Sequence, residues 1–210
     1  MDYCNSRNEK YEFTIDLVRS LRQCLDSKRV YSVNNKADGL ESVYLSGEKL
    51  SEARKLMSKW TNSKNIEIKN LSLEFSTAVD NMISSGDLFE TLSKGISPAD
   101  HETDIALAKA RYKTGEEKLF NSSIDIIPII SSKKKYDKKI KRVQYNLTKK
   151  QLSSVAYYIE TTFEKELREY DLKKKQKQNR VIDNYTLSAP ERAIIYIRQF
   201  IETGKLVEEP

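Results

Sequence analysis

Glycine and proline are scarce along this chain: six Gly and four Pro occur in 210 residues. These residues interrupt helices and strands and form most tight turns, so their scarcity predicts few turns and long elements. Hydrophobic residues make up 38% and charged residues 32% of the sequence. That balance is typical of long helices with one apolar stripe and a large solvated face. The sequence therefore predicts an elongated all-α protein.

Apolar residues recur at steps of three and four in several blocks, which is the spacing of one face of a helix. Phe13 and Leu17 illustrate the pattern in the first block. The predicted helical blocks run over residues 9–29, 40–60, 68–92, 105–120 and 134–185. The spacing of Ser188, Pro190 and Glu191 predicts a capping box, with either a kink or a new helix start.

Positive charge is concentrated between Ser131 and Arg180, where sixteen Lys/Arg stand against six Asp/Glu, a surplus of +10 in a chain whose total is +6. We call its two densest runs the first basic segment (Lys133–Arg142) and the second basic segment (Lys173–Arg180). These runs are either solvated helix ends or a binding surface. Each contains three consecutive lysines, whereas a solvated face usually mixes both signs of charge. The pattern favours a polyanionic partner: a lipid surface, a nucleic acid or an acidic protein.

Two further sets of apolar residues stand out. The β-branched run Ile124–Ile130 is the least helical stretch, and it is either a short buried segment or an exposed apolar wedge. Its place beside the first basic segment favours the wedge, because apolar insertion and cationic attraction together hold interfacial segments to anionic lipid. Trp60, Tyr157, Tyr158 and Phe163 stand at helical spacing. We expect these four aromatic residues in the core or at a dimer seam.

Catalytic chemistry has little support in the sequence. His101 is the only histidine, so no histidine-based triad or histidine-rich metal site is expected. The glycines occur singly, and none forms a phosphate-binding loop. The carboxylates between Glu164 and Asp171 alternate with Lys165 and Arg168, as in ion pairs along a helix. We expect a protein that is not an enzyme and has no cofactor, metal or small-molecule substrate.

The cysteines and the hydropathy of the chain indicate its cellular compartment. Cys4 and Cys24 have neither disulfide-framework nor metal-site spacing, which favours a reducing compartment. No run of about 18 apolar residues exists, so no membrane span is expected. The first residues lack the basic-then-apolar order of a secretion signal. The expected location is cytoplasmic.

The positive charge allows three interpretations. A nucleic-acid binder should interleave aromatic residues with its basic ones, but only Tyr136 and Tyr145 fall among the lysines of the first basic segment and beside it. A coiled-coil adaptor should keep a strict heptad repeat, which breaks at the second basic segment. A membrane-surface scaffold needs long helices and clustered Lys/Arg, each contributing about 1 kcal/mol near an anionic surface. The third interpretation fits most of the pattern.

The chain also carries an ordered series of features from Glu160 to Ile201. Lys165-Glu166-Leu167 precedes Tyr170; a basic stretch, a hydrophobic pair and two aromatic residues follow. These later features are Lys173 to Lys177, Val181 and Ile182, Tyr185 and Phe200. The series resembles the last helix of the BAR domain of sorting nexins.

This resemblance implies a single helical domain over residues 1–210, an elongated antiparallel bundle of three long, kinked helices. Phe13 to Trp60 and Ile66 to Phe120 would contribute the first two, and residues 123–134 would form a basic and apolar tip loop before the third. Two such chains, identical or different, would dimerise into a six-helix, BAR-like coiled-coil body. That body would bind anionic endosomal membranes from the cytoplasmic side, and would sense or impose their curvature in sorting and vesicle trafficking.

The predicted lipid-binding residues are the cations of the two basic segments: Lys133, Lys134, Lys135, Lys138, Lys139, Lys141, Arg142, Lys173, Lys174, Lys175, Lys177 and Arg180. The first group would lie at each tip of the dimer and the second nearer its middle. The alternative hypothesis is a helical coiled-coil adaptor or assembly subunit. It would hold an acidic protein or a nucleic acid through the same Lys-rich segments.

Overall fold

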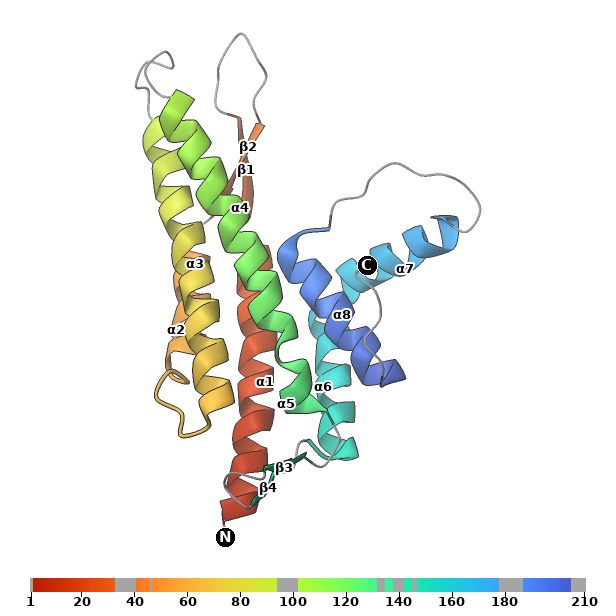
Figure 1. Ribbon diagram of the computed structural model, residues 1–210. Coiled ribbons are helices and arrows are strands. Elements are labelled where there is room, and N and C mark those ends of the chain that lie inside the picture. Colours follow the sequence, from red (N-terminus) through yellow and green to blue (C-terminus); the bar gives the residue numbers. More distant parts are fainter. Residues whose placement is uncertain are drawn as a thin grey trace.

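The computed structural model describes residues 2–32, 41–45, 47–93, 102–131, 135–137, 142–144, 147–177 and 187–204. They form a packed helical bundle with two short β hairpins (Figure 1). The helices are α1 (Asp2–Asp26), α2 (Gly47–Ser58), α3 (Ile66–Ser93), α4 (Glu102–Ile124), α5 (Ile127–Ile130), α6 (Lys149–Thr162), α7 (Glu164–Lys177) and α8 (Ala189–Thr203). The strands are β1 (Lys28–Ser32), β2 (Glu41–Leu45), β3 (Lys135–Asp137) and β4 (Arg142–Gln144).

Helix α1 is the centre of the bundle, with α2 on one side and α6 on the other (Figure 1). Phe13, Leu17 and Leu21, four residues apart, are fully buried, as their spacing predicts. The rings of Phe13 and Trp60 meet edge-on with centroids 5.6 Å apart. Burial of each large apolar side chain contributes about 1.5–3 kcal/mol. The apolar stripe of α1 thus belongs to the core that holds the helices on its two sides together.

Helices α3 and α4 pack along each other over most of their length (Figure 1). Phe75, Val79 and Met82 of α3 are buried, again at helical spacing. Gly115 of α4 lies where the two helices approach closely, because a Cβ there would stand 2.6 Å from Met82 Cγ and 3.1 Å from the Ala78 carbonyl oxygen. This glycine sets the distance between the two helices.

Helix α8 closes the other side of the bundle against α4, α1 and α6. It begins with the predicted capping box, in which the backbone N–H of Ser188 donates to Glu191 Oε2 at 2.8 Å. Pro190 occupies the first turn, where its missing N–H costs no intrahelical bond. The helix ends at Gly204 with φ 66°. The prediction of a new helix start at Ser188 is confirmed.

Two stretches predicted as helix are strands instead. Residues 41–45 form β2 and pair antiparallel with β1, with Val30 opposite Val43. Residues 135–137 and 142–144 form the β3–β4 hairpin inside the predicted block 134–185. The sequences KRVYS and ESVYL are rich in β-branched and aromatic residues, which favour strands. Strand pairing decided between the two conformations in these short stretches.

The helical fold class is confirmed, but the described residues do not form three long helices. The longest helix among them is α3, with 28 residues. After β4 the predicted third helix is divided into α6 and α7 by Phe163, which is fully buried with φ −118° and ψ 28°. The chain bends there because burial of the ring outweighs helical continuity. Val181, Ile182 and Tyr185 lie outside the described residues.

The isoleucine run is buried rather than exposed. Ile127, Ile129 and Ile130 belong to α5 and are 6%, 1% and 0% exposed. Helix α5 lies against α1 inside the bundle (Figure 1). Residues 123–131 of the expected tip loop therefore complete α4 and form α5, while residues 132–134 lie outside the described residues. The wedge hypothesis is wrong, because the run supplies apolar side chains to the core.

Candidate functional site

The described residues include about half of the predicted lipid-binding cations. Lys135 lies in β3 and Arg142 in β4, and four lysines of the second basic segment lie in α7: Lys173, Lys174, Lys175 and Lys177. The remaining cations lie outside the described residues: Lys133, Lys134, Lys138, Lys139, Lys141 and Arg180. His101 lies outside them as well.

The structure separates the two basic segments. The β3–β4 hairpin lies near the N-terminus of α1 and precedes the start of α6, whereas α7 leaves the opposite end of α6 (Figure 1). With its 14 residues, α6 spans about 21 Å. Any partner that contacts both segments must therefore be an extended surface or a long polymer.

Helix α7 is anchored at its base and projects from the bundle at its far end (Figure 1). Leu167 is 2% exposed and lies in the core. Five residues later Leu172 is 59% exposed, and Lys174 is exposed with its Nζ 5.9 Å from the Tyr170 ring centroid. Residues 172–177 read LKKKQK and contain no acid. The projecting end is thus cationic and carries one exposed leucine.

Arginines of other helices pair with the acids at the base of α7. Arg22 Nη1 of α1 lies 2.9 Å from Glu166 Oε1, and Arg198 Nη1 of α8 lies 3.2 Å from Asp171 Oδ1. Within α7, Arg168 pairs with Glu164 at 2.5 Å. These three carboxylates are therefore paired with arginines.

Two of these arginines are held in their charged form. Desolvation works against the charge of Arg22, but hydrogen bonds and the charges of Asp26 and Glu166 outweigh it and raise its pKa. Desolvation likewise opposes the charge of Arg198, and the hydrogen bond to Asp171 with the charges of Glu160 and Glu202 raises its pKa. These networks fix the base of α7 to α1 and α8.

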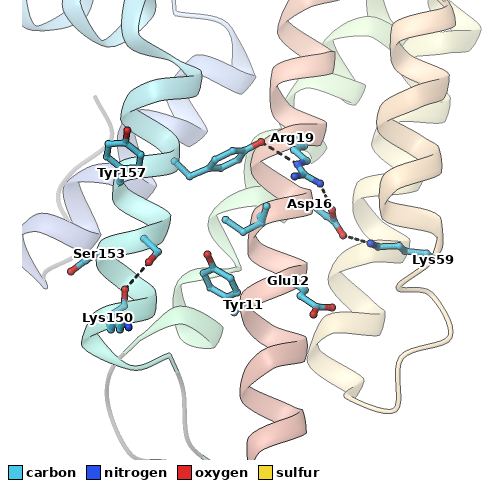
Figure 2. A pocket seen from close by; sticks show the side chains of 11 residues that line it. Tyr11, Glu12, Asp16, Arg19, Lys59, Lys150, Ser153 and Tyr157 are labelled. Atoms are coloured by element: carbon cyan, nitrogen blue, oxygen red, sulfur yellow. Dashed lines mark hydrogen bonds and ion pairs between the residues drawn. The ribbon is translucent and has the colours of Figure 1, made fainter.

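An open groove of about 770 Å³ lies between α1 and α6 (Figure 2). Its α1 side carries Tyr11, Glu12, Ile15, Asp16 and Arg19. Its α6 side carries Lys150, Ser153, Ser154, Tyr157 and Tyr158, and Lys59 borders it beyond α1. The lining therefore combines tyrosine, serine and basic side chains around one isoleucine.

Asp16 organises the α1 side of the groove. This carboxylate is 4% exposed and accepts a hydrogen bond from Trp60 Nε1 at 3.0 Å. Lys59 Nζ lies 2.5 Å and Arg19 Nη1 3.7 Å from its oxygens, so one acid holds two cations (Figure 2). Both cations stay about half exposed, with side chains 55% and 54% accessible. Asp16 thus holds Lys59 and Arg19 at the groove while neutralising only one of them.

The α6 side contributes fixed and exposed groups. Arg19 Nε donates to the hydroxyl of Tyr158 at 3.1 Å across the groove, and this bond is the main cause of a raised pKa of Arg19 (Figure 2). Tyr157 is 72% exposed. Lys150 is exposed and makes no ion pair with any described residue.

Sequence reasoning missed this groove. Trp60 and Phe163 are buried as expected, at 9% and 0% exposure. Tyr157 was expected in the core or at a dimer seam, but its side chain stands in solvent in this chain. The one available signal was Asp16, an acid set within the apolar stripe of α1, yet its partners come from a distant part of the chain.

The described residues contain no group of three or more His, Cys, Asp or Glu side chains that could hold a metal ion. None of the helices in that part of the chain is long and apolar enough to cross a bilayer. Comparison of the chain with known protein families, with curated proteins and with solved structures gives no match. The site must therefore be interpreted from its own geometry.

Proposed function

We propose that this chain is a peripheral scaffold that binds anionic membrane surfaces through its two basic segments. The projecting end of α7 is the observation that carries the proposal. Lysines near an anionic leaflet contribute about 1 kcal/mol each. The exposed Leu172 adds apolar area beside them, as in other interfacial helices.

The separation of the basic segments supports an extended partner surface. The segments lie at opposite ends of α6, so a compact ligand in one pocket cannot contact both. A nucleic acid would be favoured by aromatic side chains free to stack among the lysines. Tyr170, the aromatic residue before these lysines, is half-buried against the core and stacked with Lys174. Lipid is therefore the better supported partner.

The resemblance to the BAR domain of sorting nexins supports the finer part of the proposal, which is dimerisation, curvature sensing and a role at endosomal membranes. In the described residues the apolar stripes of α1, α3 and α8 are buried within one chain. A dimer would accordingly join two packed bundles through their outer faces. It would not be formed by interleaving three helices from each chain whose apolar stripes are exposed before association.

Co-sedimentation with vesicles tests the proposal. The chain should pellet with phosphatidylcholine–phosphatidylserine vesicles and stay in the supernatant with pure phosphatidylcholine. Lys173→Glu, Lys174→Glu and Lys175→Glu together should weaken binding about 100-fold or more, since each lysine contributes about 1 kcal/mol. Equal recovery on the two kinds of vesicle would remove the electrostatic mechanism.

A charge-matched control separates a local surface from overall charge. Lys69, Lys109 and Lys113 are exposed on α3 and α4. Their triple change to glutamate alters net charge by the same amount and should leave most of the binding intact. An electrophoretic shift on short DNA and RNA completes the comparison. Binding there with no binding to anionic vesicles would favour the nucleic-acid alternative.

A further inference from the structure

We propose that the groove between α1 and α6 is a docking site for an acidic peptide segment of a partner protein. This interaction would be separate from the membrane contacts of the basic segments. It rests on the composition, charge and shape of the groove (Figure 2).

The lining has the composition of a protein-recognition surface. Tyrosine and arginine are enriched at protein interfaces, and tyrosine with serine is typical of adaptable binding surfaces. Here Tyr11, Tyr157 and Tyr158 line the groove together with Ile15 and Arg19. Tyr157 is 72% exposed, so a large aromatic side chain stands uncovered at the edge of the groove. Such a residue gains most by contact with a partner side chain.

The charges of the groove favour an acidic occupant. Arg19, Lys59 and Lys150 line it together with Glu12 and Asp16, which leaves one positive charge in excess. Asp16 is buried and already accepts from Trp60 and Lys59, so its carboxylate is occupied by contacts within the chain. The cations keep their exposed donors for carboxylates of a ligand. Electrostatic complementarity of this kind supplies specificity and speeds association.

The arrangement of the cations favours an extended segment of chain. The groove is open and extends across α1, with Lys150 on one side of α1 and Lys59 on the other (Figure 2). A peptide with acids at both ends and a large apolar residue between them would match these cations and the apolar side chain of Ile15 in the lining. Because Arg19 is already fixed by Tyr158 and Asp16, little ordering of that side chain is needed on binding.

Selection of peptides on the intact chain tests this proposal. Random dodecapeptides displayed on phage are selected on the wild-type protein and depleted on a Lys150→Glu/Tyr157→Ser double variant. We expect the recovered peptides to be rich in Asp and Glu around a large apolar residue. In fluorescence anisotropy, each single variant should weaken their binding about tenfold, the loss expected for an interface residue that contributes about 1.4 kcal/mol.

Matched controls are available on α3. Lys69 is an exposed lysine and Leu73 a 44% exposed apolar residue, and neither of them lines the groove. Lys69→Glu and Leu73→Ser should leave the affinity of the selected peptides within twofold. Circular dichroism on all variants establishes that the helices are retained.

Several results would overturn the proposal. These are the recovery of no peptide, recovery of peptides without acidic residues, and affinities that are equal in wild type and groove variants. If the double variant loses vesicle binding instead, the groove is a lipid contact. If the wild-type chain self-associates and the double variant does not, the occupant is a second copy. The triple lysine variant of α7 should keep peptide binding, so failure here and failure of the membrane proposal are distinguishable.

Discussion

At the scale of single residues, Asp16 shows how one side chain shapes a surface. The carboxylate is 4% exposed, yet it holds Lys59, Trp60 and Arg19 by the contacts described above. A buried charge is tolerated only with such partners, because desolvation otherwise costs several kcal/mol. Those partners connect α1 to the chain after α2 and hold two cations at the edge of the groove. A stabilising contact and a binding surface thus share the same atoms.

Gly115 gives a prediction at this scale. Gly115→Ala should lower the free energy of unfolding by about 1–2 kcal/mol in urea denaturation. Overpacking against Met82 costs about 1–3 kcal/mol, and the higher helix propensity of alanine offsets up to about 1 kcal/mol of that. Gly47→Ala is the matched control, since no atom lies within 4 Å of a Cβ there. A neutral or stabilising Gly115→Ala would contradict the close approach of α3 and α4.

Cys24 gives a prediction for alkaline pH. Full burial raises the pKa of its thiol, while in the unfolded chain the thiol ionises near its usual value of about 8.5. Above that pH the thiol ionises in the unfolded chain but not in the folded one, which favours unfolding. The free energy of unfolding therefore falls by up to about 1.4 kcal/mol per pH unit. Urea denaturation from pH 8 to 11 should show a smaller decline for Cys24→Ala than for wild type. Identical declines would show that the thiol does not contribute.

At the scale of elements, helix ends decide where this chain changes direction. Thr148 and Ser188 begin α6 and α8 with capping boxes, and Phe163 ends α6 because its ring is buried. The bend at Phe163 directs α7 away from the bundle, and Arg22 and Arg198 pair with its acids at the base. The position of the second basic segment therefore depends on core packing and on ion pairs made by helices far away in the sequence.

The capping box of α8 can be tested directly. Ser188→Ala should lower the free energy of unfolding by about 1 kcal/mol, because the first-turn N–H groups lose a partner. Ser51→Ala, at an exposed position of α2, should change it by less than about 0.5 kcal/mol. Thermal denaturation followed by circular dichroism measures both. Equal effects of the two substitutions would argue against a stabilising cap.

At the scale of the whole molecule, positive charge is unevenly placed on a bundle whose apolar residues are mostly buried in one core. The acids at the base of α7 are paired with arginines, whereas residues 172–177 at its far end contain lysines and no acid. The open groove and the projecting helix are different kinds of surface on the same chain. If both proposals hold, the groove binds a peptide and the helix a membrane, and one molecule would connect the two.

Salt dependence gives a prediction for the whole molecule. Binding to anionic vesicles should weaken steeply as salt rises from about 0.1 M to 1 M, where the Debye length falls from about 10 Å to about 3 Å. The α7 triple variant should respond to salt much less than wild type. Sedimentation equilibrium gives the state of the chain in the same buffers: a dimer has about 49 kDa, twice the 24.4 kDa chain. Salt-independent vesicle binding would count against an electrostatic mechanism.

The sequence by itself determined the local features of this protein. The spacing of Phe13, Leu17 and Leu21 determined a buried helical face, and Ser188 with Glu191 determined a helix start. Such signals are local, because a helix repeats every 3.6 residues and a cap involves neighbours three residues apart. The charge of the basic segments is likewise a property of the sequence alone.

Only the tertiary structure decided the rest. Residues 41–45 form a strand because they pair with β1, and the isoleucine run is buried in the core, so it is not the predicted exposed wedge. The groove unites Arg19 with Tyr158, which are 139 positions apart, and no local pattern contains that contact. Pairings between distant segments depend on how whole helices pack, and packing depends on every buried side chain at once.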